Sequence, residues 1–275
     1  MLPRLCLLLV LALPLPAAIP SWQTSPRASV LINGGATMSG DHFAPSVLPA
    51  IRGHFAGCRT VALVLHATPP DDRDRMEVRL QEAFRDAGVP EARSLHRMDE
   101  AGAKRWLETA DAIFVGGGET FVLLRDLAAT GQLDLIRRRV LAGAPYFGVS
   151  AGSNVAGPVI GTTNDFPVAE IPSRHALALL PVSINPHHPL PEEKGEFATR
   201  ANKIRWYLRF NPDERVLALG NASMVRLHEG VLRPVAGRAW LYDRKGPREL
   251  PLGEPVPELS VPGAVAPAAV AAPKS

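Results

Sequence analysis

The sequence predicts an α/β domain with a mostly parallel sheet that is covered by helices on both faces. Short apolar runs, typical of buried strands, alternate along the chain with segments whose apolar residues recur at helical spacing. The apolar runs stop at glycine or proline, as strands do before a turn. Because strands that alternate with helices need crossover connections, their sheet is expected to be parallel.

The first half of the chain contains two predicted strands and three predicted helices. In chain order they are the strand 29–33, the helix 46–55, the strand 60–66 and the helices 74–87 and 100–109. The helix 74–87 has the clearest pattern, because Met76, Leu80 and Phe84 recur at helical spacing before Gly88. The strands have no such period, and both are short and apolar.

The second half continues the alternation and then changes to closely spaced strands. The predicted elements are the strand 112–115, the helices 120–129 and 132–142, the strands 145–147 and 176–184, the helix 196–209, and short strands at 216–219, 224–227 and 231–235. Only turn residues separate the last three strands, so we expect them to form a small antiparallel extension at the C-terminal end of the domain.

The two ends of the chain differ in composition from the middle. Residues 1–18 have one positive charge, an apolar run of about eleven residues and small residues at its exit, which is the pattern of a secretory signal peptide. We therefore expect an exported protein, periplasmic or secreted, or a cytoplasmic one if the start is misassigned. Residues 251–275 are rich in proline and alanine and predict a disordered tail after a folded body at 29–248.

Charge and composition exclude several classes of protein. Lys and Arg number 30 against 27 Asp and Glu, a net charge of +3, so we expect no nucleic-acid binding. The hydrophobic content of 46% is sufficient for a sizeable core, and no segment is long or apolar enough to span a membrane. After removal of the leader, Cys58 would be the only cysteine and could form no intramolecular disulfide.

The pentad from Gly148 to Gly152 is the first of two glycine-rich loops that follow predicted strands. It has the pattern G-x-S-x-G, between a strand and a segment of small residues able to begin a helix. This pattern is typical of a nucleophilic serine, because the sharp, strained turn leaves room only for small neighbours. Ser150 would then lie at a helix N-terminus, whose dipole and free amides favour developing negative charge.

The three glycines at 116–118 form the second loop. Without side chains, their backbone amides can approach a ligand closely. We expect an oxyanion hole with one donor from Gly117 or Gly118 and one from Ala151. Nucleotide binding is disfavoured, because Phe121 breaks the pattern G-x-G-x-x-G and no P-loop motif occurs. The chain is therefore expected to need no organic cofactor.

His187 is the best candidate for the base that takes the proton from Ser150. It follows the strand predicted at 176–184, which places it at the same edge of the sheet as the serine. His188 would point elsewhere, because neighbouring side chains diverge. No carboxylate or cysteine is spaced to complete a metal site with this histidine pair, so we expect no metal.

Four motifs in order are FVGGGETF at 114–121, GVSAGSN at 148–154, TTNDFP at 162–167 and INPH at 184–187. Together they resemble the peptidase E family of aspartyl dipeptidases, relatives of the cyanophycinases, over residues 29–235. The resemblance implies a flavodoxin-like fold of the class I glutamine-amidotransferase type. It also implies hydrolysis of small peptides with an N-terminal aspartate by Ser150 and His187, with Asp165 contributing to activity.

Two positions depart from the family pattern. Asn221 stands where the family has the glutamate of its catalytic triad, and would orient His187 as a neutral acceptor; the alternative is that Asp165 orients it. Glu119 stands where the family has asparagine. A carboxylate at this position could hold the ammonium group of a substrate but would repel an aspartyl side chain.

The substrate carboxylate needs a cation. Arg200 and Lys203, on the helix predicted at 196–209, lie near positions at which the family has basic residues. They are candidates for binding this carboxylate, and the alternative is that they belong to a solvated helix face.

The favoured function is a serine exopeptidase that cleaves small peptides through an acyl-enzyme, as a monomer or homodimer. A cyanophycinase-like hydrolase of β-aspartyl peptides and a non-catalytic binding module on the same fold are the alternatives. An α/β-hydrolase esterase is disfavoured, because Ser150, Asp165 and His187 lie too close in sequence for the later strands of that fold.

Overall fold

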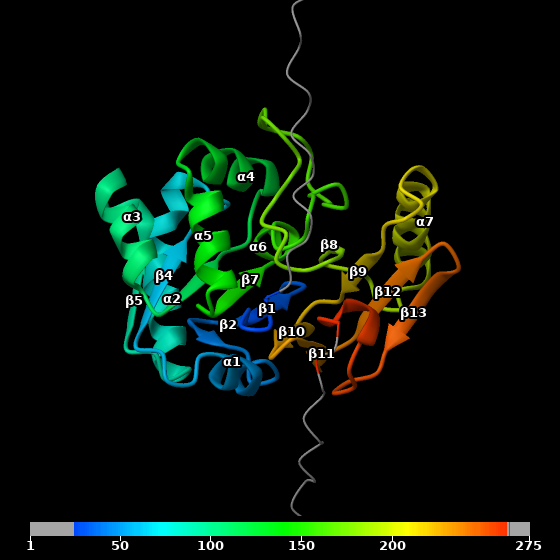
Figure 1. Ribbon diagram of the computed structural model, residues 1–275, viewed down its shortest axis with the longest axis horizontal. Coiled ribbons are helices and arrows are strands. Elements are labelled where there is room, and N and C mark those ends of the chain that lie inside the picture. Colours follow the sequence, from blue (N-terminus) through cyan, green and yellow to red (C-terminus); the bar gives the residue numbers. More distant parts are fainter. Residues whose placement is uncertain (1–24, 263, 265–275) are drawn as a thin grey trace, which may run out of the picture.

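The computed structural model describes residues 25–262 and residue 264 (Figure 1). The predicted signal peptide at 1–18 lies outside the described residues. The predicted fold class is confirmed, because five strands of a seven-stranded sheet are parallel and helices cover both faces of that sheet.

The large sheet is built from β1 (Val30–Asn33), β4 (Thr60–Val64), β5 (Glu91–Ser94), β6 (Ala112–Val115), β7 (Tyr146–Val149), β10 (Met224–His228) and β11 (Val231–Ala236). Their order across the sheet is β11-β10-β1-β7-β6-β4-β5, and only β10 and β11 run antiparallel to their neighbours. The carboxyl ends of the five parallel strands therefore meet at one edge, where open α/β sheets carry their binding sites.

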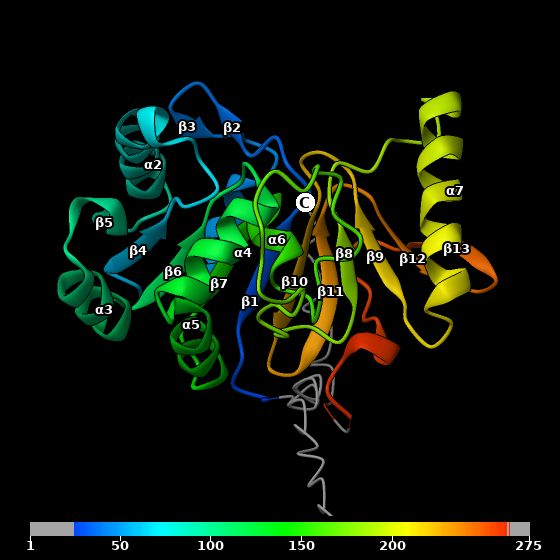
Figure 2. The same cartoon turned by 90° about the horizontal axis from the view of Figure 1, so that it is seen from above.

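Two groups of helices enclose the large sheet. One face packs against α1 (Leu48–His54) and α2 (Arg73–Asp86), and the other against α3 (Glu100–Thr109), α4 (Thr120–Ala129), α5 (Gln132–Leu141) and the short α6 (Ala151–Asn154). Figure 2 shows α2 on one side of the strands and α3, α4 and α5 on the other. Alternate residues of β1 belong to the two cores: Val30 and Ile32 to one, Leu31 to the other.

The chain also forms a second, four-stranded sheet. It contains β8 (Ser183–Asn185), β9 (Val216–Leu219), β12 (Ala239–Asp243) and β13 (Gly246–Leu250) in the order β13-β12-β9-β8, and α7 (Lys194–Phe210) packs on it. A small hairpin of β2 (Met38–Ser39) and β3 (His42–Phe43) completes the strands. The predicted antiparallel strands at the C-terminal end are confirmed: β10 and β11 pair antiparallel in the large sheet, and β9 pairs antiparallel with β12 and, on its other side, in parallel with β8.

Several elements differ from their prediction. Of the strand predicted at 176–184, only Ser183 and Ile184 belong to a strand, β8. The preceding apolar residues are buried in a loop whose amides donate to carbonyls that follow α6. Strands β2, β3, β5, β12 and β13 were not predicted. Of these, β5 and β13 lie at sheet edges and carry polar residues on exposed positions, so they lack an apolar run.

The tail is ordered further than the composition predicts. Val256 donates its amide to Leu232 O at 2.8 Å, and Val256 and Leu259 are buried in the core beside β11. The expectation of disorder from residue 251 is therefore wrong as far as Leu259. Proline removes a donor but does not prevent neighbouring apolar side chains from packing. Residues 263 and 265–275 lie outside the described residues.

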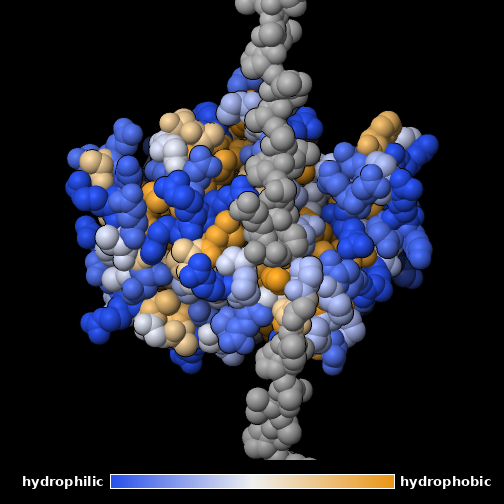
Figure 3. All heavy atoms as spheres, viewed as in Figure 1, coloured by the Kyte–Doolittle hydropathy of each residue, from blue (hydrophilic) through white to orange (hydrophobic). Residues whose placement is uncertain are grey.

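The surface visible in Figure 3 is mostly hydrophilic, and its apolar atoms form small, separate areas. Within the described part of the chain, no helix is long and apolar enough to cross a bilayer. Most large apolar side chains are instead placed in the cores between sheet and helices.

Because of the buried His54, we expect the free energy of unfolding to fall at mildly acid pH. The ring of His54 donates from Nε2 to Tyr146 O at 2.9 Å, and burial together with the charge of Arg226 lowers its pKa to about 3. The unfolded chain takes up this proton near pH 6.5, so the contribution to stability is complete above pH 6.5 and is lost as the pH falls towards 3.

In urea unfolding, we expect the free energy of unfolding to fall by about 2 kcal/mol more in the parent than in His54→Gln between pH 7 and pH 5. Glutamine serves as the control because it can donate to the same carbonyl but does not titrate. Equal losses in the two proteins would mean that the folded state accepts the proton as readily as the unfolded chain does.

Candidate active site

Ser150 occupies a strained turn between β7 and α6. Its backbone has φ 53° and ψ −109°, values that a residue with a side chain rarely adopts. Its amide donates to Asn33 O, at the end of the neighbouring strand β1, at 3.1 Å. The turn therefore holds the serine side chain at the carboxyl edge of the sheet, partly exposed.

The two glycines of the pentad are required by close backbone packing. A Cβ on Gly148 would lie 2.5 Å from Gly152 O, and a Cβ on Gly152 would lie 2.1 Å from Val115 O of β6. These backbone atoms cannot move without distorting the sheet, so the glycines allow α6 to lie directly against β6 and β7.

We expect Gly152→Ala to lower the free energy of unfolding by roughly 3 kcal/mol, because the added methyl overlaps backbone. Gly195→Ala is the matched control. Gly195 lies in α7 with nothing within 4 Å of its would-be Cβ, so this alanine is expected to be neutral or stabilising. Thermal unfolding of both variants checks the prediction, and a similar Tm for both would contradict it.

His187 reaches the serine from the loop after β8. Its Nε2 lies 2.8 Å from Ser150 Oγ. Its backbone is also left-handed, with φ 52°, and its amide donates to Gly34 O at 2.8 Å. A Cβ on Gly35 would lie 2.1 Å from His187 Cε1, so the glycine pair after β1 makes room for the imidazole. In the sequence, this pair predicts only the end of the strand at 29–33.

Asn221, in the turn after β9, is the partner of the other ring nitrogen. Its Oδ1 lies 2.8 Å from His187 Nδ1. When Oδ1 accepts, Nδ1 carries the proton and the unprotonated Nε2 can accept from the serine hydroxyl. Because β9 lies beside β8, the turn at Asn221 is next to the loop of His187.

Asp165 does not contact His187, which corrects the alternative in which it orients the imidazole. Its Oδ2 accepts from the backbone amide of Thr120 at 2.9 Å and from the Thr120 hydroxyl. Thr120 is the first residue of α4, so Asp165 fastens its loop to the N-terminus of that helix, where a carboxylate is favourable.

The glycine loop after β6 lies beside the serine. A Cβ on Gly117 would lie 3.0 Å from Ser150 Cβ, and one on Gly118, whose φ is 132°, would lie 2.1 Å from Ala67 O. Among the described residues, the amides of Gly117, Gly118 and Ala151 donate to no acceptor. These amides are thus available to a ligand atom at the serine.

Glu119 has one engaged and one unpartnered carboxylate oxygen. As the N-cap of α4, it accepts the amide of Val122 on Oε2 at 2.7 Å. Its Oε1 is buried and has no hydrogen-bond partner within residues 25–262. Burial raises the pKa of Glu119, and the charge of Asp165 raises it further. A buried oxygen without a donor is costly and favours a cationic ligand.

Arg200 is not part of a solvated helix face. Its Nη1 donates to Asn185 Oδ1 at 3.1 Å, to Pro186 O at 3.3 Å and to His187 O at 3.2 Å, and burial lowers its pKa. Lys203 lies one turn further along α7. Both side chains line a cavity of about 90 Å³ between α7 and the loop that begins at Gly161.

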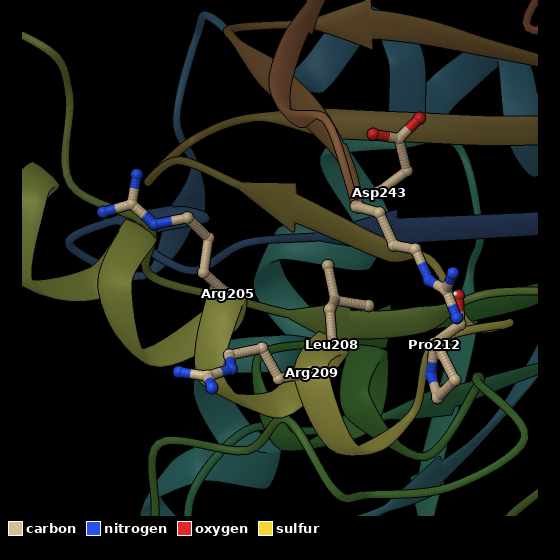
Figure 4. A pocket seen from close by; sticks show the side chains of 6 residues that line it. Arg205, Leu208, Arg209, Pro212 and Asp243 are labelled. Atoms are coloured by element: carbon tan, nitrogen blue, oxygen red, sulfur yellow. Dashed lines mark hydrogen bonds between the residues drawn. The ribbon is translucent and has the colours of Figure 1, made fainter.

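A larger hollow on the same helix contains no residue of this site. It is lined by Arg205, Leu208, Arg209, Pro212, Asp243 and Arg244. Figure 4 shows the guanidinium groups of Arg205 and Arg209 directed away from Leu208, so they do not converge on a common ligand position. No three His, Cys, Asp or Glu side chains in the described part of the chain are grouped to hold a metal ion.

Comparison with known proteins gives one consistent relationship. The model of peptidase family S51 matches residues 30–235. The chain is 37% identical over 238 residues to peptidase E of Streptomyces coelicolor, covering 84% of this chain and 94% of the relative. It is 42% identical over 177 residues to a Drosophila melanogaster protein named "Probable alpha-aspartyl dipeptidase", covering 62% of this chain and 70% of the relative.

A solved structure of a peptidase from an acI-B1 Actinobacterium has the same fold, with a TM-score of 0.62 and 16% identity over 83% of this chain and 96% of that one.

Proposed function

The chain belongs to peptidase family S51 and is a serine peptidase, and we propose that it removes an N-terminal residue, aspartate above all, from dipeptides by means of Ser150, His187 and Asn221. One observation carries the assignment of these residues. Two hydrogen bonds of 2.8 Å join the serine hydroxyl, the imidazole and the asparagine oxygen in a line at the carboxyl edge of the sheet.

The geometry supports a two-step acyl transfer. Ser150 Oγ attacks the peptide carbonyl while its proton passes to His187 Nε2, and the C–N bond then breaks as the imidazolium returns the proton to the leaving amine. Water attacks the resulting ester with His187 again as base. The Ser150–acyl bond breaks, and the proton returns to the serine oxygen.

The negative charge that develops on the carbonyl oxygen needs donors that are already in place. The amides of Gly117 or Gly118 and of Ala151 can supply them, because they flank Ser150 and donate to no acceptor among the described residues. Ala151 also begins α6, so the first free amides of a helix face the developing charge.

Charged groups on the loops and helices around the site fit a short peptide with free ends. Glu119 offers an unpartnered buried oxygen to the substrate ammonium group. Arg200 and Lys203 form no ion pair within the described residues, so their cavity is cationic and fits a substrate carboxylate. The name of the Drosophila relative points to α-aspartyl dipeptides, and a carboxylate-binding cavity is consistent with such a substrate.

The purified protein is expected to cleave Asp-Leu and to leave N-acetyl-Asp-Leu intact, because the blocked peptide has no ammonium group for Glu119. Release of leucine, measured by chromatography, tests this preference. Equal cleavage of both peptides would contradict an exopeptidase and favour a general peptidase or esterase.

Replacing Glu119 with glutamine is expected to raise KM for Asp-Leu by about tenfold and to change kcat little, since a neutral amide loses one charge-assisted bond to the substrate. The glutamine retains an oxygen for the amide of Val122, so the helix cap is preserved. An unchanged KM would remove Glu119 from the substrate site.

We also propose that the protein is exported. The proposal rests on the composition of residues 1–18, with a charged start, an apolar run and small residues at the exit. Fractionation of cells that express the full chain, with N-terminal sequencing of the product, tests it. An intact N-terminus in the cytoplasmic fraction would refute export.

A further inference from the structure

His188, the neighbour of His187, points away from the serine into the second sheet. It is 2% exposed, and the rings of Phe197 and Trp240 lie with centroids 5.0 Å from its own. Neither solubility nor the proposed catalytic chemistry explains why the histidine that follows His187 is so deeply buried.

The hydrogen bonds of His188 define one neutral tautomer. Pro189 O can only accept, so Nδ1, at 2.8 Å, must carry the proton. Nε2 is then an acceptor, and it lies 2.8 Å from the hydroxyl of Tyr242 on β12, which donates to it. Burial lowers the pKa of His188 to about 4, so this form persists at neutral pH.

These contacts attach the loop after β8 to the second sheet. The amide of His188 donates to Leu219 O at the end of β9, at 2.9 Å, and its ring accepts a hydrogen bond from the hydroxyl of Tyr242 on β12. Asn221 follows Leu219 by two residues. The ring of His188 therefore ties the backbone of His187 to the same sheet from which the asparagine partner of His187 extends.

The backbone at His187 needs such an attachment. A non-glycine residue with φ near 52° is strained, and the conformation persists only where the surroundings hold it. Relaxation of this residue would displace the imidazole from Ser150, and a displacement of about 1 Å can cost a hundredfold in rate. Arg200, one turn from Phe197 on α7, also donates to His187 O and supports the same loop.

We propose that His188 is a positioning residue that holds His187 in line between Ser150 and Asn221. The inference rests on the proposed role of His187 as the general base. It assigns to the Tyr242–His188–Pro189 hydrogen bonds the task of fixing a strained backbone, and it predicts effects on the rate of the chemical step rather than on substrate binding.

Two variants separate the hydrogen bonds from the packing. His188→Phe fills the aromatic site but loses both bonds, and Tyr242→Phe loses only the hydroxyl that donates to Nε2. We expect His188→Phe to lower kcat for Asp-Leu by tenfold to a hundredfold, with KM within a factor of about two, and Tyr242→Phe to lower kcat by several-fold. His188→Asn, which can retain the donor to Pro189 O, is expected to recover part of the loss.

His54→Asn is the matched control. His54 is also a buried histidine bonded to a backbone carbonyl, but its partner Tyr146 lies at the start of β7, at the other end of that strand from Ser150. Its substitution is expected to lower Tm with kcat unchanged. A kcat of His188→Phe within twofold of the parent, or a loss no larger than that of His54→Asn, overturns the proposal.

A second readout separates failure of this inference from failure of the proposed function. In proton NMR spectra, the Nδ1 proton of His187, held by Asn221, should give a downfield signal in the parent that broadens or disappears in His188→Phe. A persistent, unshifted signal overturns the positioning role whether or not the protein cleaves peptides. A parent protein that shows the signal but cleaves no dipeptide instead refutes the function.

Discussion

Ser150→Ala is expected to lower kcat/KM for Asp-Leu by at least about 10⁴-fold, because the covalent route is lost and only binding and oxyanion stabilisation remain. The backbone of the turn should persist, since the Ser150 amide still donates to Asn33 O. Dipeptide cleavage by equal amounts of folded parent and variant gives the ratio.

Ser46→Ala, at an exposed serine that precedes α1, is the control and should retain full activity. A fluorophosphonate probe provides an independent measurement, because it reacts with an activated serine. We expect one adduct, at Ser150, in the parent and in Ser46→Ala, and no adduct in Ser150→Ala. A Ser150→Ala protein as active as the parent would exclude the acyl-enzyme mechanism.

The second large effect is expected at Asn221. Asn221→Ala removes the acceptor from His187 Nδ1, so the imidazole loses both its preferred tautomer and its orientation. We expect kcat to fall by about a hundredfold with a small change in KM. A kcat within twofold of the parent would mean that the asparagine does not orient the histidine.

Asn221→Asp tests the role of charge, because aspartate has the shape of asparagine. A carboxylate stabilises the imidazolium formed during the reaction better than a neutral amide does. We therefore expect a higher kcat at neutral to alkaline pH and an acid limb of the kcat/KM profile that lies at higher pH than in the parent. A profile identical to that of the parent from pH 5 to 9 would contradict electrostatic control by this position.

Local patterns were sufficient to find the serine and the histidine that meet at the edge of the sheet. The pentad around Ser150 indicates a turn that is possible only with glycine on both sides. An apolar run that stops before His187 predicts that this residue lies at a strand end. Strand ends share an edge in a parallel sheet, so the meeting of these two residues could be inferred without coordinates. The distance of 2.8 Å between Ser150 Oγ and His187 Nε2 agrees with that inference.

The choice between Asn221 and Asp165 could not be made in this way. Both residues lie in predicted loops that could reach His187, and a carboxylate is the commoner partner for a catalytic histidine. The choice depends on strand order. Pairing of β9 with β8 brings Asn221 to the imidazole, whereas the loop of Asp165 is held at the N-terminus of α4 through Thr120. Strand order depends on contacts between distant segments, which no local pattern records.

The sequence by itself determined the layered α/β fold and pointed to the proposed nucleophile and its proposed base, because hydrophobic period, strand stops and glycine spacing are local properties of the chain. Only the tertiary structure decided which side chains complete the site: the neutral partner Asn221, the unpartnered oxygen of Glu119, the brace from Arg200 and the buried ring of His188. Each of these features depends on segments that are distant in the sequence, either through a contact between them or through the burial that their packing produces. Such contacts exist only once the two sheets are assembled.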